Sequence, residues 1–222
     1  MKRIRLLLAL FSLSLGSCQQ ESKLYLRTVA WSLGGLEISW LYVDEGKKLI
    51  VKNPQFGVNP LNEEKERAEN PSSIGNYEVD GNMMRVKWAD GKADQRGVEF
   101  KDGEISAWDA GLCVKAKPFP NSRIDDMNYE GKIGFGNVSN NTTIRFGKDG
   151  RFSMRSMGAV LGTTELQGAI SETPERTGTY SIEGNTLTFR FDDGEEWITP
   201  AQPNDMGNQE MIIGTRLFKK IQ

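Results

Sequence analysis

The chain has 222 residues, of which 26% are charged and 37% hydrophobic, so it is long enough for one or two compact domains. Its 28 basic and 30 acidic residues nearly balance, which argues against nucleic acid as a partner. It contains no histidine, the commonest general base and transition-metal ligand. We therefore expect no enzymatic activity, no metal and no cofactor.

The N-terminal segment Met1–Ser17 has the features of a lipoprotein signal peptide. Basic residues precede the apolar run Leu6–Leu15, which is too short to span a bilayer as a helix. Leu15-Gly16-Ser17-Cys18 resembles the bacterial lipobox, in which cleavage precedes a cysteine that then carries lipid. An ordinary secretory peptide is the alternative. We predict a signal peptide over residues 1–17, lipid attachment at Cys18 and a tether over residues 18–23.

The predicted anchor also predicts a location, the bacterial cell envelope, with the membrane as partner through the lipid. In Gram-negative lipoproteins, an aspartate after the cysteine commonly retains the protein in the inner membrane. Gln19 occupies that position here. We therefore expect the outer membrane, at its periplasmic or surface face, if the host is Gram-negative.

The first predicted domain covers residues 24–119 and is read as short antiparallel strands. Strands are expected at 24–33 and 36–43, and then at 49–51, 98–100, 105–108 and 112–115. Between residues 53 and 74 the alternation stops, and a short helix is expected over 61–69, where two glutamates in the first turn suit the helix dipole. An antiparallel sheet of this size usually curls so that its edges are covered.

The clearest pattern in the chain is a repeat, because residues 75–91 match residues 178–194 without a gap at an offset of 103. Both copies hold two alternating runs separated by Asp80-Gly81 or Glu183-Gly184, which predicts a tight hairpin turn. The proline-containing stretch before residue 127 predicts a linker over residues 120–126. The second domain is then expected over residues 127–222.

Several of these stretches resemble a group of poorly characterised bacterial lipocalin-like (calycin-like) proteins, many of them lipoproteins. The stretches are Gly75–Gly81 with Val86–Gly91, Lys148–Phe152, Gly178–Leu187 and Ile213–Arg216. The resemblance implies an all-β fold of two tandem antiparallel meander repeats. Each repeat is expected to form a small lipocalin-like β-barrel or a strongly curved sheet.

One function that fits such barrels is binding of a small apolar ligand, admitted past the irregular segments 53–74 and 156–177. The candidate lining is the set of aromatic residues expected to face inward, Trp31, Trp40, Trp88, Phe189 and Phe191. The alternative is that these side chains fill the core, since eight-stranded barrels can be filled by side chains alone.

The other function is a protein–protein interaction or structural scaffold module that holds an envelope protein. An exposed apolar patch around residues 157–161 would favour it. Two further features are expected to be structural. Cys113 lies in an apolar run and is read as a buried hydrophobic residue, and the acidic stretch Asp192–Glu196 is read as a solvated hairpin tip rather than a calcium site.

Overall fold

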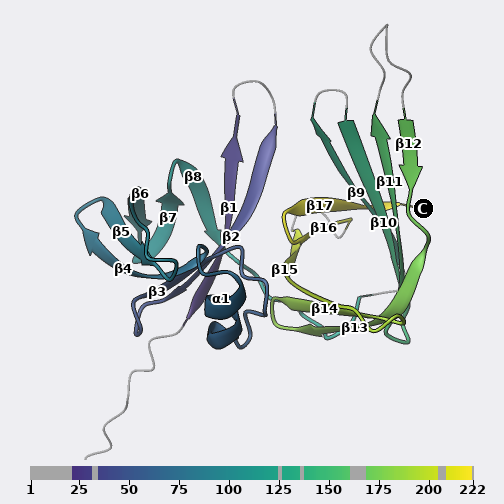
Figure 1. Cartoon of the computed structure of the whole chain (residues 1–222), viewed down its shortest axis with the longest axis horizontal. Coiled ribbons are helices and arrows are strands. Elements are labelled where there is room, and N and C mark those ends of the chain that lie inside the picture. Colours follow the sequence, from purple (N-terminus) through teal and green to yellow (C-terminus); the bar gives the residue numbers. More distant parts are fainter. Residues whose placement is uncertain are drawn as a thin grey trace, which may run out of the picture.

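The computed structural model describes residues 22–31, 35–124, 127–135, 138–160, 169–204 and 209–221. The predicted signal peptide and Cys18 lie outside these residues. The described chain folds into two β-barrels that lie side by side, the first purple to teal and the second green to yellow (Figure 1). The expected all-β fold of two tandem barrels is confirmed.

The first barrel is a closed ring of eight antiparallel strands. They are β1 (Lys23–Ala30), β2 (Leu36–Asp44), β3 (Leu49–Lys52), β4 (Ile74–Asp80), β5 (Met83–Trp88), β6 (Ala93–Lys101), β7 (Glu104–Trp108) and β8 (Gly111–Lys115). Neighbours in sequence pair throughout, and β1 closes the ring by pairing with both β2 and β8. Closure leaves no open sheet edge in this barrel.

The second barrel repeats this ring with one addition. Its strands are β9 (Met127–Phe135), β10 (Val138–Phe146), β11 (Arg151–Val160), β13 (Arg176–Glu183), β14 (Thr186–Phe191), β15 (Glu196–Asn204), β16 (Glu210–Ile213) and β17 (Arg216–Ile221). Pairing of β9 with β17 and of β10 with β11 closes these eight described strands. The extra strand β12 (Ala169–Glu172) pairs with the second half of β11.

The predicted hairpin turns occur in both barrels, one residue later than expected. Asp80 pairs with Met83, so the two-residue loop is Gly81-Asn82, and in the second barrel it is Gly184-Asn185. Both glycines have φ near +60°, at the first central position, where a two-residue hairpin loop of type II′ needs glycine.

The glycines that open each repeated stretch are explained by close packing of neighbouring strands. A Cβ on Gly75 would lie 2.6 Å from the carbonyl oxygen of Lys87, and one on Gly178 would lie 2.0 Å from that of Arg190. Only glycine allows the two strands to approach this closely at these points. The repeat therefore preserves the geometry of the barrel.

Side chains fill the interior of both barrels, and each core residue is at most 8% exposed. The first core holds Tyr25, Leu41, Val43, Ile50, Tyr77, Met84, Val86, Trp88, Val98, Ile105, Trp108 and Cys113. The second holds Ile124, Tyr129, Ile144, Phe146, Phe152, Tyr180, Ile182, Leu187, Phe189, Phe191, Ala201, Met211, Ile213 and Phe218. Cys113 is buried as expected, and burial raises the pKa of its thiol to about 11.

The segment between β3 and β4 contains the predicted helix, α1 (Glu63–Glu69). It begins two residues later than expected because Asn62 is its N-cap, and the Asn62 side chain accepts a hydrogen bond from the Lys65 amide. The segment was expected to form a ligand entrance, and it borders a pocket at one end of the first barrel through Asn53 and Ser73. It covers the outer face of the first barrel, where Val58 packs with Tyr42 and Val51.

The same segment joins the two barrels by buried hydrogen bonds. The amides of Val58 and Asn59 both donate to Oγ1 of Thr186, at 2.9 and 3.1 Å. The Asn59 side chain accepts from the amide of Asn185, whose own side chain donates to the carbonyls of Lys117 and Ala201. The hairpin tip of the second repeat is thus an inter-barrel contact, whereas Asn82 in the first repeat is exposed.

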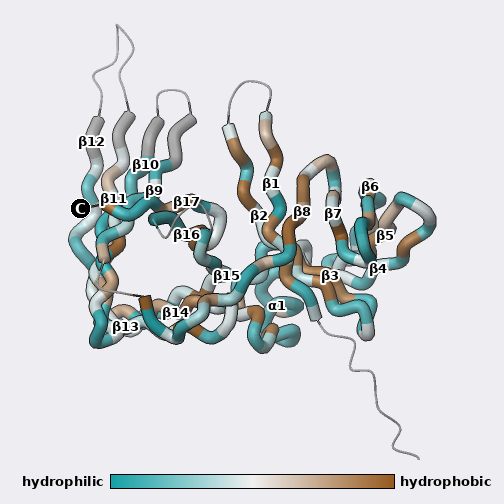
Figure 2. Tube along the Cα trace, turned by 180° about the vertical axis from the view of Figure 1, so that it is seen from behind, coloured by the Kyte–Doolittle hydropathy of each residue, from teal (hydrophilic) through white to brown (hydrophobic). Residues whose placement is uncertain are grey.

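An apolar cluster completes this contact. Leu26, Ile38 and Trp40 project from the outer face of β1 and β2 and pack with Ile212 of the second barrel. Figure 2 shows the hydrophobic residues along β2, β3 and β8 in brown. Several strands of the first barrel are apolar on both faces because the interior buries one face and the α1 segment or the second barrel buries the other.

Candidate ligand sites

The five aromatic residues predicted to line a ligand cavity are placed in three different environments. Trp31 is 59% exposed at the end of β1, and Trp40 is buried between the barrels. The expectation that Trp40 faces the interior is wrong, whereas Trp31 lines a pocket at the open end of the first barrel. In β2 the inward residues are Leu41 and Val43, so the alternation places Trp40 outside.

Trp88, Phe189 and Phe191 do face the interior, as expected. Trp88 belongs to the first core and the two phenylalanines to the second. The ring of Phe189 stacks on Trp197 at a centroid distance of 5.1 Å and meets Phe152 edge-on. These contacts occupy the aromatic faces, so the residues act as packing in the described barrels. The second predicted entrance, residues 156–177, lies partly outside the described residues.

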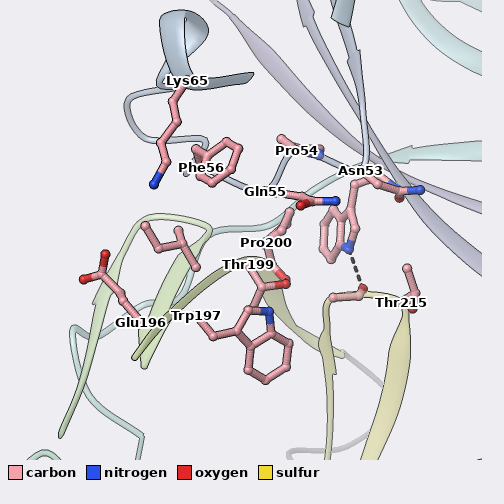
Figure 3. Close-up of a pocket in the computed structure, with 13 residues that line it drawn as sticks. Asn53, Pro54, Gln55, Phe56, Lys65, Glu196, Trp197, Thr199, Pro200 and Thr215 are labelled. Atoms are coloured by element: carbon pink, nitrogen blue, oxygen red, sulfur yellow. Dashed lines mark hydrogen bonds between the residues drawn. The ribbon is translucent and has the colours of Figure 1, made fainter. Parts of the chain in front are cut away.

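A pocket of about 470 Å³ lies between the barrels (Figure 3). Phe56 and Lys65 of the first barrel lie on one side of it, and Trp197 and Thr199 of β15 on another. The indole N–H of Trp40 donates to the carbonyl of Gly214 across the junction. This hydrogen bond ties one wall of the pocket to the other.

A second pocket, of about 540 Å³, opens at the end of the first barrel where β1 finishes and β2 begins. We call it the first-barrel mouth. Its lining includes Arg27, Trp31, Glu37, Lys52, Arg96 and Trp108. It shares Trp40 and Asn53 with the pocket between the barrels. The mouth carries charges and tryptophans, in contrast to the apolar core below it.

The Arg27 side chain lines the mouth and is held there by hydrogen bonds from all three of its guanidinium nitrogens. Its Nε and Nη2 donate to the carbonyl oxygens of Trp108 and Asp109, at 3.0 and 2.7 Å. Its Nη1 donates to Glu37 at 3.0 Å and to Ser39 at 3.2 Å. Gly111 makes room for this side chain, since a Cβ there would lie 2.5 Å from Nε. Arg27 is thus neutralised and held in place.

Lys52 differs from the other cations of the mouth. Arg96 forms ion pairs with Asp94 and Asp109, but Lys52 has no ion pair among the described residues. Its ammonium lies 4.3 Å from the ring centroid of Trp88. Burial lowers the pKa of Lys52 below its usual value, which reflects the cost of a charge that lacks a carboxylate partner.

Two buried polar atoms near Lys52 have no hydrogen-bond partner among the described residues. They are the indole nitrogen of Trp108, a donor, and Oδ1 of Asp94, an acceptor. Trp108 is only 4% exposed, and its side chain lines the mouth. Because buried polar groups are nearly always paired, a partner outside the chain that enters the mouth would complete the indole N–H of Trp108.

Comparison with known protein families gives a match, and it lies in the second barrel. The model of the lipocalin-like domain matches residues 122–205, which cover most of that ring. The second barrel is similar to a lipocalin-like domain. Curated proteins and solved structures give no match to the chain. The first barrel has the same order of eight strands, so the lipocalin-like fold expected from the resemblance is confirmed for the tandem pair.

In a lipocalin-like barrel with a filled core, a ligand site is expected at the open end, because barrel mouths are common positions for small-molecule sites. The described residues hold no cluster of carboxylate and cysteine ligands for a metal ion. They also form no helix of the length and hydrophobicity needed to cross a bilayer. The acids around Asp193 are paired with arginine, since Arg176 bridges Asp193 and Glu195.

Sequence reasoning missed Arg27, Lys52 and Trp108. A usable signal was present, because Arg27 follows Tyr25 by two residues and Lys52 follows Ile50 by two residues. A charged residue that continues the inward alternation of a strand indicates the end of the core and the start of a polar mouth.

Proposed function

We propose that the chain is a non-enzymatic binding protein whose first-barrel mouth takes a small polar molecule with an anionic group. The observation that carries this proposal is the unpartnered indole N–H of Trp108, buried in a pocket beside a lysine that lacks an ion pair. An anionic acceptor would receive the indole hydrogen bond and neutralise Lys52.

The size and chemistry of the site define the ligand class. A pocket of about 540 Å³ falls within the range of small-molecule sites, roughly 300–1,000 Å³. The apolar core below it is filled, so the expected small apolar ligand is replaced here by a polar one. The exposed ring of Trp31 at the rim offers a flat surface for the body of the ligand.

We further propose that this binding protein is a lipoprotein of the bacterial cell envelope, held to the membrane through Cys18. The lipobox-like Leu15-Gly16-Ser17-Cys18 supports this location. β1 begins at Lys23, five residues after the cysteine, so the tether would reach about 17 Å at most when extended, at roughly 3.4 Å per residue. Metabolic labelling with a radioactive fatty acid tests the anchor, and Cys18→Ser is expected to abolish the labelling.

Native mass spectrometry tests the ligand directly. The mature Cys18→Ser protein, purified from its own host, is expected to carry a reproducible extra mass that denaturation releases. Trp108→Phe removes the indole donor, and Lys52→Gln removes the charge, so both variants are expected to lose the extra mass. Trp197→Phe, outside the mouth, is the matched control and should retain it. A bare mass in every preparation would contradict the proposal.

A second candidate function, binding of an envelope protein, is favoured by exposed apolar residues on the outer face of β8. Leu112 and Val114 are 68% and 61% exposed and project from the same face. Met157, in the stretch 157–161 where an exposed apolar patch would favour this function, is 41% exposed. Crosslinking in the host distinguishes this function, since Leu112→Ser with Val114→Ser would then remove a specific crosslinked band and leave the bound mass unchanged.

A further inference from the structure

Equivalent positions in the two barrels follow from strand register. In the first barrel, Arg27 of β1 pairs with Ser39 of β2 and Cys113 of β8. In the second barrel, Gly131 of β9 pairs with Thr142 of β10 and Phe218 of β17. Arg27 therefore corresponds to Gly131, Ser39 to Thr142 and Cys113 to Phe218.

The first and last strands of the two barrels carry arginine and glycine in opposite positions. In the first barrel the arginine is on β1 and the glycine on β8, and in the second the glycine is on β9 and the arginine on β17. Gly111 precedes Cys113 by two residues, and Arg216 precedes Phe218 by two residues. A Cβ on Gly111 would touch the Arg27 side chain, and one on Gly131 would touch the Phe218 ring. Both barrels thus place one arginine at the same level of the interior, from β1 in the first and from β17 in the second.

The two arginines make the same pair of contacts to the neighbouring strand, with one change of charge. Nη1 of Arg27 donates to Glu37 and Ser39, whereas Nη1 of Arg216 donates to Asn140 at 3.2 Å and Thr142 at 2.9 Å. Asn140 precedes Thr142 by two residues, as Glu37 precedes Ser39. The carboxylate of the first barrel is therefore an amide in the second.

The remaining donors of the two arginines also differ. In Arg27, Nε and Nη2 are both engaged by backbone carbonyls. In Arg216, Nε and Nη2 have no hydrogen-bond partner, and no carboxylate forms an ion pair with the guanidinium, within the part of the chain that the structure describes. The Nε–Nη2 edge is the fork that matches two oxygens of a carboxylate or phosphate.

We propose that Arg216 is an oxyanion-binding site of the second barrel, which takes the carboxylate or phosphate group of a small molecule on its Nε–Nη2 edge. Asn140 and Thr142 hold the guanidinium by Nη1 and leave its charge uncompensated. Phe218, two residues further along the same face of β17, is 1% exposed and closes the interior below it. The ligand must therefore be short. This site is independent of the mouth of the first barrel.

The test is an NMR titration of the arginine side-chain Nε–H signals in the intact Cys18→Ser protein, with sodium acetate and sodium phosphate as probes and sodium chloride as the control. The Arg216 signal is assigned by its absence from Arg216→Lys. At least one oxyanion is expected to give a saturable shift of this signal, and the stronger probe identifies the preferred group. The Arg27 signal should not respond, because its Nε already donates to Trp108.

Asn140→Asp supplies the decisive variant, since it restores the carboxylate that Glu37 provides in the first barrel and keeps nearly the same shape. The proposal predicts that its oxyanion affinity falls at least tenfold, or about 1.4 kcal/mol, while its fold is retained. Arg190→Gln on the outer face of β14 should bind as the parent does. Equal binding by Asn140→Asp, or shifts no larger than those with chloride, would overturn the proposal.

Discussion

Trp108 links the packed interior of the first barrel to its polar mouth. Its ring belongs to the apolar core, Arg27 lies 5.7 Å from the ring centroid, and its indole N–H has no hydrogen-bond partner among the described residues. An unmade hydrogen bond of a buried group costs roughly 1–3 kcal/mol. A ligand that accepts this hydrogen bond would recover that free energy on binding.

The pKa of Lys52 makes ligand binding depend on pH. Burial lowers this pKa below 10.5, with Asp90, Asp94, Arg96 and Asp109 as the charged neighbours. The ammonium is charged only below its own pKa, so affinity for an anionic ligand should fall as pH rises through the lowered value, earlier than for an ordinary lysine. Isothermal titration with the ligand recovered from the purified protein, at pH 7 to 10, measures this.

The corresponding variants separate binding from stability. A lysine whose folded-state pKa is lowered is a charge that folding disfavours, so Lys52→Met should not reduce the melting temperature although it abolishes binding. Lys52→Arg should bind without the decline at high pH, because arginine stays protonated. A pH profile for Lys52→Arg that declines as in the parent would assign the titration to another group.

At the scale of elements, the Asn53–Ile74 segment depends on one buried carboxylate. Glu66 is 0% exposed and accepts hydrogen bonds from the amides of Gln55 and Phe56, the latter at 2.9 Å. The Asn70 side chain donates to its other oxygen. The helix α1 thus positions the Glu66 carboxylate so that it holds the preceding irregular segment by hydrogen bonds to its backbone.

Replacing Glu66 by alanine should therefore destabilise the protein more than its short helix suggests. Two backbone amides would lose their buried acceptor, which is expected to lower the free energy of unfolding by about 2–4 kcal/mol. Urea denaturation measures the change. Glu64→Ala, on the exposed side of the same helix, is the control and should change the free energy by at most about 0.5 kcal/mol.

The sequence predicted these elements unevenly, for physical reasons. Alternation and turn glycines are local signals, so the strands, the repeated hairpins and the barrel class could be predicted. The outer position of Trp40 could not, because β2 is apolar on both faces and alternation alone does not say which face is inside. The contacts of Arg216 likewise depend on strand register, which brings residues from opposite ends of the second domain together.

At the scale of the whole molecule, the two barrels are joined by specific buried contacts in addition to the short connection between them. Thr186 accepts two amides of the first barrel, and Trp40 donates to Gly214 of the second. Asn185 and Thr186 follow directly on the turn glycine of the repeated hairpin. The same hairpin turn is therefore exposed in the first repeat and part of the inter-barrel contact in the second.

Thr186→Val should uncouple the barrels. It keeps the side-chain volume but removes the acceptor of the Val58 and Asn59 amides, at an expected cost of about 2–4 kcal/mol. Differential scanning calorimetry should then resolve two transitions in place of a single cooperative one. Thr188→Val, the same change at a position that accepts neither amide, should leave the profile unchanged. A single transition in Thr186→Val would show that the remaining contacts, the Asn59–Asn185 and Trp40–Gly214 hydrogen bonds and the apolar cluster, suffice to couple the barrels.

The start of β1 distinguishes the two ends of the first barrel. Lys23 is fixed there by Glu45 and Glu104, at 3.0 and 3.3 Å, and the strand then runs toward the hairpin that it forms with β2. The last residues of β1 and β9 and the first residues of β2 and β10 lie on the same side of the molecule (Figure 1). Arg27 and Arg216 are held near the strands that begin at these ends. A lipid on Cys18 would therefore attach the protein to the bilayer at the end of the first barrel where β1 begins. Both guanidinium groups would then lie toward the opposite end, away from the bilayer.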